Sequence, residues 1–447
     1  MTTTDFNTPS RLVLALAAAG LFALPGCTGD GYNGTDDPFN GNGNGNNNTD
    51  DDDSVGQAQT ALTGVVRDAQ GLPISGVTIS ADGLSATTNQ DGRFFIEDMA
   101  VGERVAVNAT KSGFAKNSTP LDILEGVENM ILITLAQTDY VGSFDAAAGL
   151  SFEVEVGGPT IALPAGGFVD SSGNPYAGEV RVEATFYDLE SDFEDGNELN
   201  ATPGDFTAID ANGAFQTLES YGMVQVNLTD ASGNEINVST GAPVVMPLQG
   251  AGYADGEIIP MWSYSETEGR WMEEAQGTVV TLGDGTLAVE FTAPHFSTWN
   301  CDRPLPTHGC VTGTVRNSQG TPRPGATVRA VGISYISTTT ARTNQNGEFC
   351  LEVKNGETVW VEISYSVGGQ IATQRTDPVT IPGGQGTCTS GSPQNCVSIG
   401  VVDMEIMSCI SGLVVTGQGQ PVAGAVVAAS SGGQATTDSS GFFCITS

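Results

Sequence analysis

Residues Leu62 to Ile96 read "LTGVVRDAQGLPISGVTISADGLSATTNQDGRFFI". Apolar and polar residues alternate with a period of two, and Val, Ile and Thr are frequent, a pattern typical of β-strands with one buried face. Gly71 and Pro73 mark a tight turn, since glycine adopts positive φ and proline presets the backbone for turn entry. The stretch therefore predicts strands joined by tight turns, with the apolar side chains facing the core of a β-sandwich.

The same pattern occurs twice more along the chain. Val311 to Leu351 read "VTGTVRNSQGTPRPGATVRAVGISYISTTTARTNQNGEFCL", and Ile410 to Ile445 read "ISGLVVTGQGQPVAGAVVAASSGGQATTDSSGFFCI". The shared Gly-x-Pro turn, Gly-(Val/Ala) strand and Gly-x-Phe strand resemble the carboxypeptidase regulatory-like domain, a small transthyretin-like β-sandwich. The resemblance implies such modules over residues 59–136 and 305–408 and a partial third repeat over 409–447. It implies no activity, because one fold hosts many functions.

Composition supports an all-β fold of tandem β-sandwich domains. The 447 residues include 59 glycines and 21 prolines, and only 15% are charged. The net charge of −37 reflects 52 acidic against 15 basic residues. This balance argues against a nucleic-acid partner, which needs clustered Lys and Arg. We interpret the acidity as a solubilising surface rather than a collector of divalent cations.

The N-terminus predicts export and a lipid anchor. Arg11 precedes an apolar run from Leu12 to Leu24, which has the length of a signal-peptide core and is too short to span a bilayer. The following "LPGC" resembles the bacterial lipobox, which implies a lipoprotein signal peptide over residues 1–26 and lipidation of Cys27. Thr28 replaces the aspartate that retains enterobacterial lipoproteins at the inner membrane, so the resemblance implies an outer-membrane anchor facing the periplasm or the exterior. The alternative is an ordinary cleaved signal with an incidental cysteine.

Residues 27–58 are predicted to form a disordered linker. The segment is rich in Gly, Asn and Asp and poor in apolar residues, so it lacks the material for a core. Its aspartates do not follow the spacing of an EF-hand loop. Ca²⁺ is therefore a conceivable partner here without support from a motif.

Residues 137–304 contain four ordered motifs: "IALPAGGFVDSSGNPYAGEVRVEATFYD", "LESYGMVQVNLTDASGN", "IPMWSYSETEGRW" and "HFSTWNCDRP". In this order they resemble the extracellular region of cartilage intermediate layer protein, which implies a β-rich domain without established catalytic residues. Asp170, Asp210 and Asp230 open Asp-x-x-Gly sequences and are predicted to cap turns. Trp262 and Trp271 flank a hairpin turn, and we expect cross-strand packing rather than a ligand platform.

The eight cysteines predict disulfides, as an exported protein permits. Cys310 and Cys350 in the second copy correspond to Cys409 and Cys444 in the third, whereas both positions change together in the first copy. This joint loss predicts the pairs Cys310–Cys350 and Cys409–Cys444. Cys388 and Cys396 flank a short insertion and are expected to pair with each other. Cys301 remains as a buried free thiol or an intermolecular bridge.

No catalytic, cofactor-binding or metal-ligating residue is assigned, and the prediction is that the protein is not an enzyme. The only histidines, His295 and His308, lie outside any zinc-peptidase motif. A partial metal site at Cys301, His308 and Cys310 is less favoured than a disulfide for Cys310. The chain has no Gly-x-Ser-x-Gly elbow, phosphate loop or dinucleotide fingerprint.

One acidic segment keeps two minor alternatives open. It reads "YDLESDFEDGNELNATPGDF", and its carboxylates include Asp188, Glu190, Asp192, Glu194, Asp195 and Glu198. Such a loop could bind Ca²⁺, or its Asp192 and Glu194 could serve a hydrolase. A solvated loop is the preferred interpretation.

The leading hypothesis is a non-catalytic cell-envelope lipoprotein with structural or adhesive β-sandwich modules, whose partner is a surface protein or a polysaccharide. The alternative is a carbohydrate-binding module that uses Tyr335 or Trp360, although both residues alternate within strand patterns and favour core packing. The third repeat stops after its Gly-x-Phe strand. We expect either a truncated sequence, which is preferred, or a half sandwich completed by a partner's strand.

Overall fold

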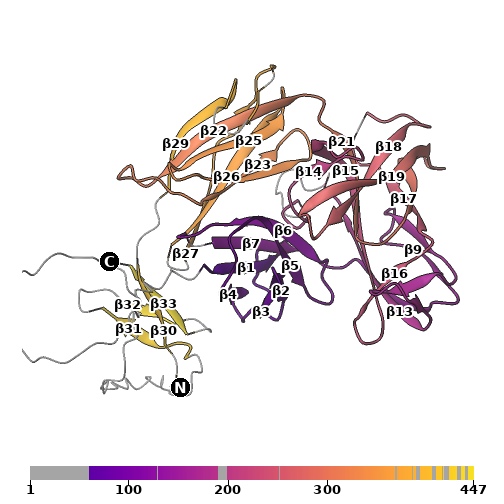
Figure 1. Ribbon diagram of the computed structural model, residues 1–447, viewed down its shortest axis with the longest axis horizontal. Coiled ribbons are helices and arrows are strands. Elements are labelled where there is room, and N and C mark those ends of the chain that lie inside the picture. Colours follow the sequence, from indigo (N-terminus) through magenta and orange to yellow (C-terminus); the bar gives the residue numbers. More distant parts are fainter. Residues whose placement is uncertain are drawn as a thin grey trace, which may run out of the picture. The chain divides into compact units, whose positions relative to one another are not determined.

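The computed structural model describes residues 60–127, 129–189, 199–250, 252–367, 370–384, 386–388, 393–404, 409–414, 416, 422–429, 434–437 and 441–446. Every regular element among them is a β-strand (Figure 1), so the predicted all-β fold of tandem β-sandwiches is confirmed. The described residues include no helix that could cross a bilayer. The signal peptide, Cys27, the linker up to residue 59 and the acidic residues 190–198 lie outside the described residues.

The first module consists of two sheets, drawn in indigo in Figure 1. In one sheet, β1 (Leu62–Asp68) lies between antiparallel β4 (Arg93–Ile96) and parallel β7 (Asn129–Leu135). The other sheet has the order β3 (Leu84–Thr87), β2 (Thr78–Ala81), β5 (Gly102–Thr110) and β6 (Asn117–Ile123). Alternate residues of both sheets meet in one core, including Val66, Ile79, Val107 and Ile133.

The second module repeats this topology. Strand β22 (His308–Arg316) lies between antiparallel β25 (Glu348–Lys354) and parallel β29 (Val397–Asp403). The facing sheet contains β24 (Thr338–Arg342), β23 (Thr327–Gly332), β26 (Thr358–Val367) and β27 (Gln370–Arg375), with β28 (Val379–Thr380) paired to β26. Both modules therefore have the same sandwich topology, in which the first strand is hydrogen-bonded to the last.

In the first and second modules, the glycine of the Gly-x-Phe motif is required by a close backbone approach. Gly92 has a φ of +70°, and a Cβ there would lie 2.3 Å from the Val66 carbonyl oxygen. The Val66 amide donates a hydrogen bond to the Gly92 carbonyl at 2.8 Å. Gly347 makes the same approach to Val315, with a φ of +76° and the same 2.3 Å distance. Any larger residue would push the turn away from the first strand of the module.

The middle region forms a sheet of fourteen strands. Its main path runs β12–β11–β16–β15–β21–β18–β19–β20–β17–β10–β9, and β13, β14 and β8 pair off this path. The strands are β8 (Tyr140–Asp145), β9 (Leu150–Glu153), β10 (Thr160–Leu163), β11 (Phe168–Asp170), β12 (Pro175–Tyr176), β13 (Glu179–Tyr187), β14 (Thr207–Ile209), β15 (Phe215–Thr229), β16 (Glu235–Val238), β17 (Ala242–Pro247), β18 (Ile258–Ser265), β19 (Arg270–Thr281), β20 (Leu287–Ala293) and β21 (Thr298–Pro304).

The predicted roles of the turn aspartates and of the two tryptophans are confirmed. In each turn the Asp Oδ1 accepts hydrogen bonds from the amides two and four residues later, as Asp170 does from Ser172 and Asn174, both at 2.9 Å. These bonds favour the charged form and lower the pKa of Asp170. Trp262 and Trp271 are completely buried within the β18–β19 hairpin.

The third repeat is described in part. Strand β30 (Cys409–Leu413) pairs with β33 (Phe442–Thr446), and β31 (Val426–Ala428) pairs with β32 (Gln434–Thr436). Ser411 lies opposite Cys444, just as Thr312 lies opposite Cys350 in the second module. The side chains of Cys409 and Cys444 lie outside the described residues, so the predicted bond between them stays a prediction.

Candidate functional site

One apolar cluster contains residues of both modules and of the middle region, and we call it the junction. The middle region contributes most of its members, among them Phe206, Trp262 and Trp271. The first module contributes Ala115 and Ala136, and the second contributes Val331 and Ile336, with Trp360 packed at its edge. Burial of aromatic side chains of this size is a large stabilising contribution, about 1.5–3 kcal/mol for a residue such as Phe.

Backbone hydrogen bonds join the middle region to each module at this junction. The Gly204 amide donates to the Ser118 carbonyl at 2.8 Å in the first module. The Phe206 amide donates to the Thr338 carbonyl at 2.9 Å, and the Ser220 amide donates to the Ile336 carbonyl at 2.9 Å in the second module. Separated modules would exchange these bonds for bonds to water, so each bond contributes about 0.5–1.5 kcal/mol to the contact.

Cations of the two modules meet carboxylates of the middle region around the same cluster. Arg104 Nη2 lies 3.0 Å from Asp205 Oδ1 and also donates to the Gly269 carbonyl at 2.6 Å. Lys354 Nζ lies 2.8 Å from Glu219 Oε2. Lys116 Nζ lies 2.6 Å from Glu266 Oε2. The sequence has only three lysines, and two of them form these links.

A buried polar network lies beneath the contact with the second module. Ser220 Oγ donates to Asn300 Oδ1 at 2.7 Å, and Asn300 Nδ2 donates to Asp302 Oδ2 at 2.7 Å. Asp302 is fully buried, and burial raises the pKa of its carboxyl group well above the ordinary range. The network is therefore favourable with Asp302 protonated and becomes less favourable when this group ionises.

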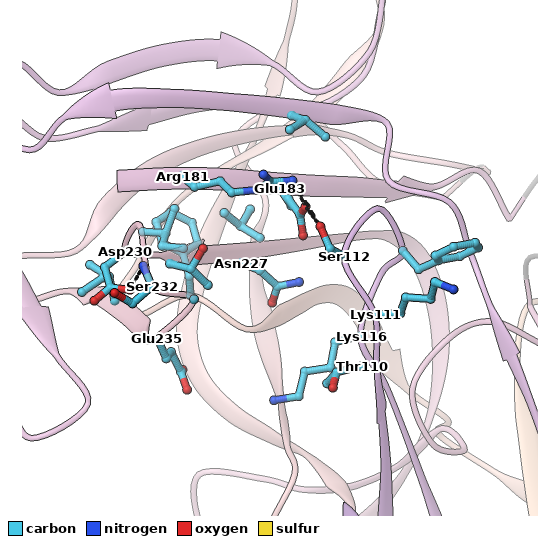
Figure 2. A pocket seen from close by; sticks show the side chains of 18 of the residues that line it. Thr110, Lys111, Ser112, Lys116, Arg181, Glu183, Asn227, Asp230, Ser232 and Glu235 are labelled. Carbon is cyan, nitrogen blue, oxygen red and sulfur yellow. Dashed lines mark hydrogen bonds and ion pairs between the residues drawn. The ribbon is translucent and has the colours of Figure 1, made fainter. Parts of the chain in front are cut away.

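A cleft of about 1130 Å³ lies between the first module and the middle region. Figure 2 shows Lys111, Ser112 and Lys116 on one side of it, with Arg181 and Asn227 on the other. Hydroxyl groups also line the cleft, at Thr78, Thr110, Ser143, Thr229, Ser232 and Ser297.

The cations of this cleft are already engaged. Arg181 Nη2 lies 2.6 Å from Glu183 Oε1, a carboxylate that also accepts from Ser112 Oγ at 3.1 Å (Figure 2). Lys111 Nζ donates to the Ser75 carbonyl, and Lys116 bonds to Glu266. Five carboxylates line the cleft against three cations, at Glu179, Glu183, Asp230, Glu235 and Glu266. This balance does not suit a phosphate or another polyanion, and it suits a ligand that exchanges hydrogen bonds through hydroxyl groups.

The disulfide pairing predicted for the second module is wrong, although the same four cysteines are used. Cys310 is bonded to Cys396, and Cys350 is bonded to Cys388. Cys310 lies opposite Glu352, two residues from Cys350, so the predicted partners are diagonal neighbours. Parallel pairing of Val311 with Val397 instead places Cys396 directly beside Cys310. The insertion then brings Cys388 to Cys350 rather than to Cys396.

Cys301 is a buried free thiol, one of the two predicted alternatives. Its Sγ lies 4.0 Å from the Tyr253 hydroxyl, and burial raises the pKa of the thiol well above its ordinary value. It does not join Cys310 in the group of four sulfurs, so the partial metal site with His308 and Cys310 does not form. His308 Nδ1 lies 4.0 Å from Glu352 Oε2, and His295 Nε2 lies 2.8 Å from Glu274 Oε2.

Both aromatic residues considered for sugar stacking pack against apolar clusters, Tyr335 in the core of the second module and Trp360 at the junction. Tyr335 is only 4% exposed, and its hydroxyl accepts a hydrogen bond from the Lys354 amide at 3.0 Å. Trp360 is half-buried at the edge of the junction, and the Arg375 guanidinium lies 4.2 Å from its ring centroid. Of the acidic segment, Asp188 is described, and Asp192 and Glu194 lie outside the described residues.

Residues 61–136 match the family model of the carboxypeptidase regulatory-like domain. The match supports the identity of the first module and covers less than half of the chain. No curated protein matches the chain.

Several solved structures resemble it at low identity. A type II cohesin–X-dockerin complex from Acetivibrio cellulolyticus has 20% identity and a TM-score of 0.16, over 18% of this chain and 59% of that one. BcpA, the major pilin subunit of Bacillus cereus, has 10% identity and a TM-score of 0.16, over 77% and 99% of the two chains. The major pilin SpaD of Corynebacterium diphtheriae has 9% identity and a TM-score of 0.17, over 70% and 90%. Scores this low support no inference about function.

Proposed function

We propose that this chain is a non-catalytic structural protein of the cell envelope, in which the middle region holds two regulatory-like sandwiches in one fixed arrangement. The observation that carries the proposal is the junction, where apolar side chains of three segments share one core. A chain of independent binding modules joined by flexible linkers has no need for such a core. A spacer that must keep its modules at a fixed separation does need a shared core between them.

The links around the junction support the same role. Arg104, Lys116 and Lys354 each reach from a module to a carboxylate of the middle region. Acidic residues far outnumber basic ones in the middle region, and these cations offset part of that charge at the contact. A fixed arrangement of the modules is consistent with both an adhesive and a spacer function.

The test measures whether the modules hold a fixed separation. Gln70 and Gln319 are exposed at equivalent turns of the two modules, and each can be replaced by an unnatural amino acid that carries a spin label. In the full chain we expect a narrow distance distribution by pulsed electron resonance. Phe206→Ala removes a completely buried ring, at a cost of about 3–5 kcal/mol, and should broaden the distribution.

Phe215→Ala is the matched control, because this ring is 51% exposed. It should leave the distribution narrow. A broad distribution in the unsubstituted chain would contradict the proposal, and so would a Phe206→Ala variant that is folded and as narrow as the control.

The envelope location rests on the resemblance of the N-terminal segment to a lipobox. We expect Cys27→Ala to release the protein from the membrane fraction and to abolish metabolic labelling with a palmitate analogue. Unchanged membrane fractionation in this variant would refute the anchor.

The cleft favours carbohydrate binding as a second candidate function. Its neutralised cations and its row of hydroxyl and amide groups match the hydrogen-bonding pattern of a saccharide. A glycan array probed with the full chain tests this idea, followed by titration with any positive glycan. Asn227→Ala should weaken binding, and Ser172→Ala, outside the cleft, should leave it unchanged. Equal affinity of both variants would exclude this cleft as the binding site.

A further inference from the structure

Four cysteine sulfurs gather on one face of the β25–β22–β29 sheet. Cys310 belongs to β22 and Cys350 to β25, and their register places both side chains on the face opposite the module core. Cys396 directly precedes β29, and Cys388 lies in the insertion before it. We call these four residues the sulfur cluster.

The two disulfides of the sulfur cluster lie in contact with each other. All four Sγ atoms lie within 4.8 Å of one another. Cys350 Sγ and Cys396 Sγ, which are not bonded to each other, are only 3.8 Å apart. Two structural disulfides can stabilise a sandwich without touching each other. The contact between these two disulfides is therefore not explained by disulfide bonding alone.

This spacing matches a tetrahedral tetrathiolate metal site. Four sulfurs that each bind Zn²⁺ at about 2.3 Å lie about 3.8 Å from one another, by tetrahedral geometry. After reduction, the sulfurs within each former disulfide need to move apart by roughly 2 Å, which side-chain rotation can supply. Thiolates are soft ligands that select Zn²⁺ over Ca²⁺ or Mg²⁺.

The surroundings position the cluster and leave it accessible. Gly386 packs directly on it, because a Cβ at this position would lie 2.7 Å from Cys310 Sγ. The Gln394 carbonyl lies 3.6 Å from both Cys310 Sγ and Cys396 Sγ, where it can accept a hydrogen bond from a reduced thiol. Cys310 is buried and the other three cysteines are half-buried, so a reductant or a metal ion can reach the group.

We propose that Cys310, Cys350, Cys388 and Cys396 form a Zn²⁺ site of four thiolates once their two disulfides have been reduced by a dithiol. Each disulfide accepts two electrons and two protons, and one dithiol closes to a cyclic disulfide for each bond broken. Zn²⁺ then displaces four protons as four zinc–sulfur bonds form. The insertion is thereby held on the sheet in both redox states, by covalent bonds or by the metal. This inference does not depend on the function proposed above.

The experiment uses the full chain and Co²⁺ as a spectroscopic probe for the zinc site. The protein is reduced with dithiothreitol, separated from it without oxygen, and titrated with Co²⁺. We expect a sulfur-to-cobalt charge-transfer band that saturates at a single equivalent and disappears on addition of Zn²⁺. The oxidised protein should give no band. Absence of the band in the reduced, folded protein would overturn the proposal.

Substitutions assign the site. Cys350→Ser with Cys388→Ser should abolish the band, whereas Cys409→Ser with Cys444→Ser, the matched pair in the third repeat, should leave it unchanged. The opposite pattern would also overturn the proposal. If the first double variant fails to fold, alkylation of the unsubstituted reduced chain tests whether the four cysteines bind Zn²⁺. Zn²⁺ should protect the four cysteines of the sulfur cluster, and equal alkylation with and without Zn²⁺ would refute the site.

Discussion

Substitution of Gly92 by alanine tests whether the Gly-x-Phe motif is required by backbone approach or only by turn conformation. Gly92 and Gly71 both have positive φ, at +70° and +80°, so alanine at either position incurs about 1–2 kcal/mol of left-handed strain. Only at Gly92 would the new Cβ meet a backbone atom, the Val66 carbonyl oxygen at 2.3 Å. Nothing lies within 4 Å of a Cβ at Gly71.

The extra overpacking at Gly92 adds about 1–3 kcal/mol to the strain. Hydrogen exchange of the amides in β1 and β4 is the appropriate assay, because global unfolding of a chain with several modules is not a two-state process. Since 1.4 kcal/mol is a factor of ten, Gly92→Ala should raise local opening about 5- to 140-fold beyond Gly71→Ala. Gly347→Ala and Gly320→Ala repeat the comparison in the second module, with 2.3 Å and open space respectively. Equal acceleration within either pair would refute the reasoning.

Three further predictions concern buried ionisable groups. Because burial raises the pKa of Asp302, the unfolded chain loses this proton first as pH rises above about 4, and stability falls until the folded group ionises. The unfolding temperature of Asp302→Asn should therefore depend less steeply on pH than that of the unsubstituted chain. Parallel pH profiles of the two proteins would contradict a raised pKa for Asp302. Cys301 should resist iodoacetamide in the folded protein at pH 8 and react after denaturation, as counted by mass spectrometry. Arg104→Met leaves the buried Asp205 carboxylate without the Arg104 cation, although Thr207 Oγ1 still donates to it at 2.6 Å, and should destabilise the contact by about 3–5 kcal/mol. The exposed pair offers the control Arg181→Met, expected to change stability by about 1 kcal/mol or less when both variants are followed by hydrogen exchange of the amides around the substituted residue.

The repeated strand and turn pattern was sufficient to predict the sandwich fold. Val66, Ile79 and Phe94 are buried as their alternation requires, and Gly92 occupies the turn that the motif marks. Aspartates such as Asp170 cap their own turns, which is a local property and can be read from five residues.

Strand direction could not be read in the same way. A period of two predicts which side chains share a face and says nothing about which strand lies beside it or in which sense it runs. The sequence pattern therefore did not predict the parallel pairing of β22 with β29. For the same reason it did not predict the disulfide between Cys310 and Cys396. Correspondence between repeats identified the right cysteines and the wrong partners.

The junction was also missed, because its members come from segments that are distant in sequence. Phe206 is the last residue of the acidic segment and resembles a loop residue, yet it is completely buried against Trp271. One signal in the sequence could have indicated the junction. Because the chain has only three lysines, each of them is a candidate for a specific contact between segments. Lys116 and Lys354 both bridge segments.

The parallel bonding of first and last strands in each module has a mechanical consequence. All seven residues of β1 are in register with β7, from Leu62 beside Asn129 to Asp68 beside Leu135. Tension applied to the two ends of the module pulls these strands past each other along their length. The hydrogen bonds between them are then loaded in shear and must break together, whereas an antiparallel terminal pair would unzip one bond at a time. Strands β22 and β29 repeat the arrangement, so each sandwich resists stretching most strongly along the direction of the chain.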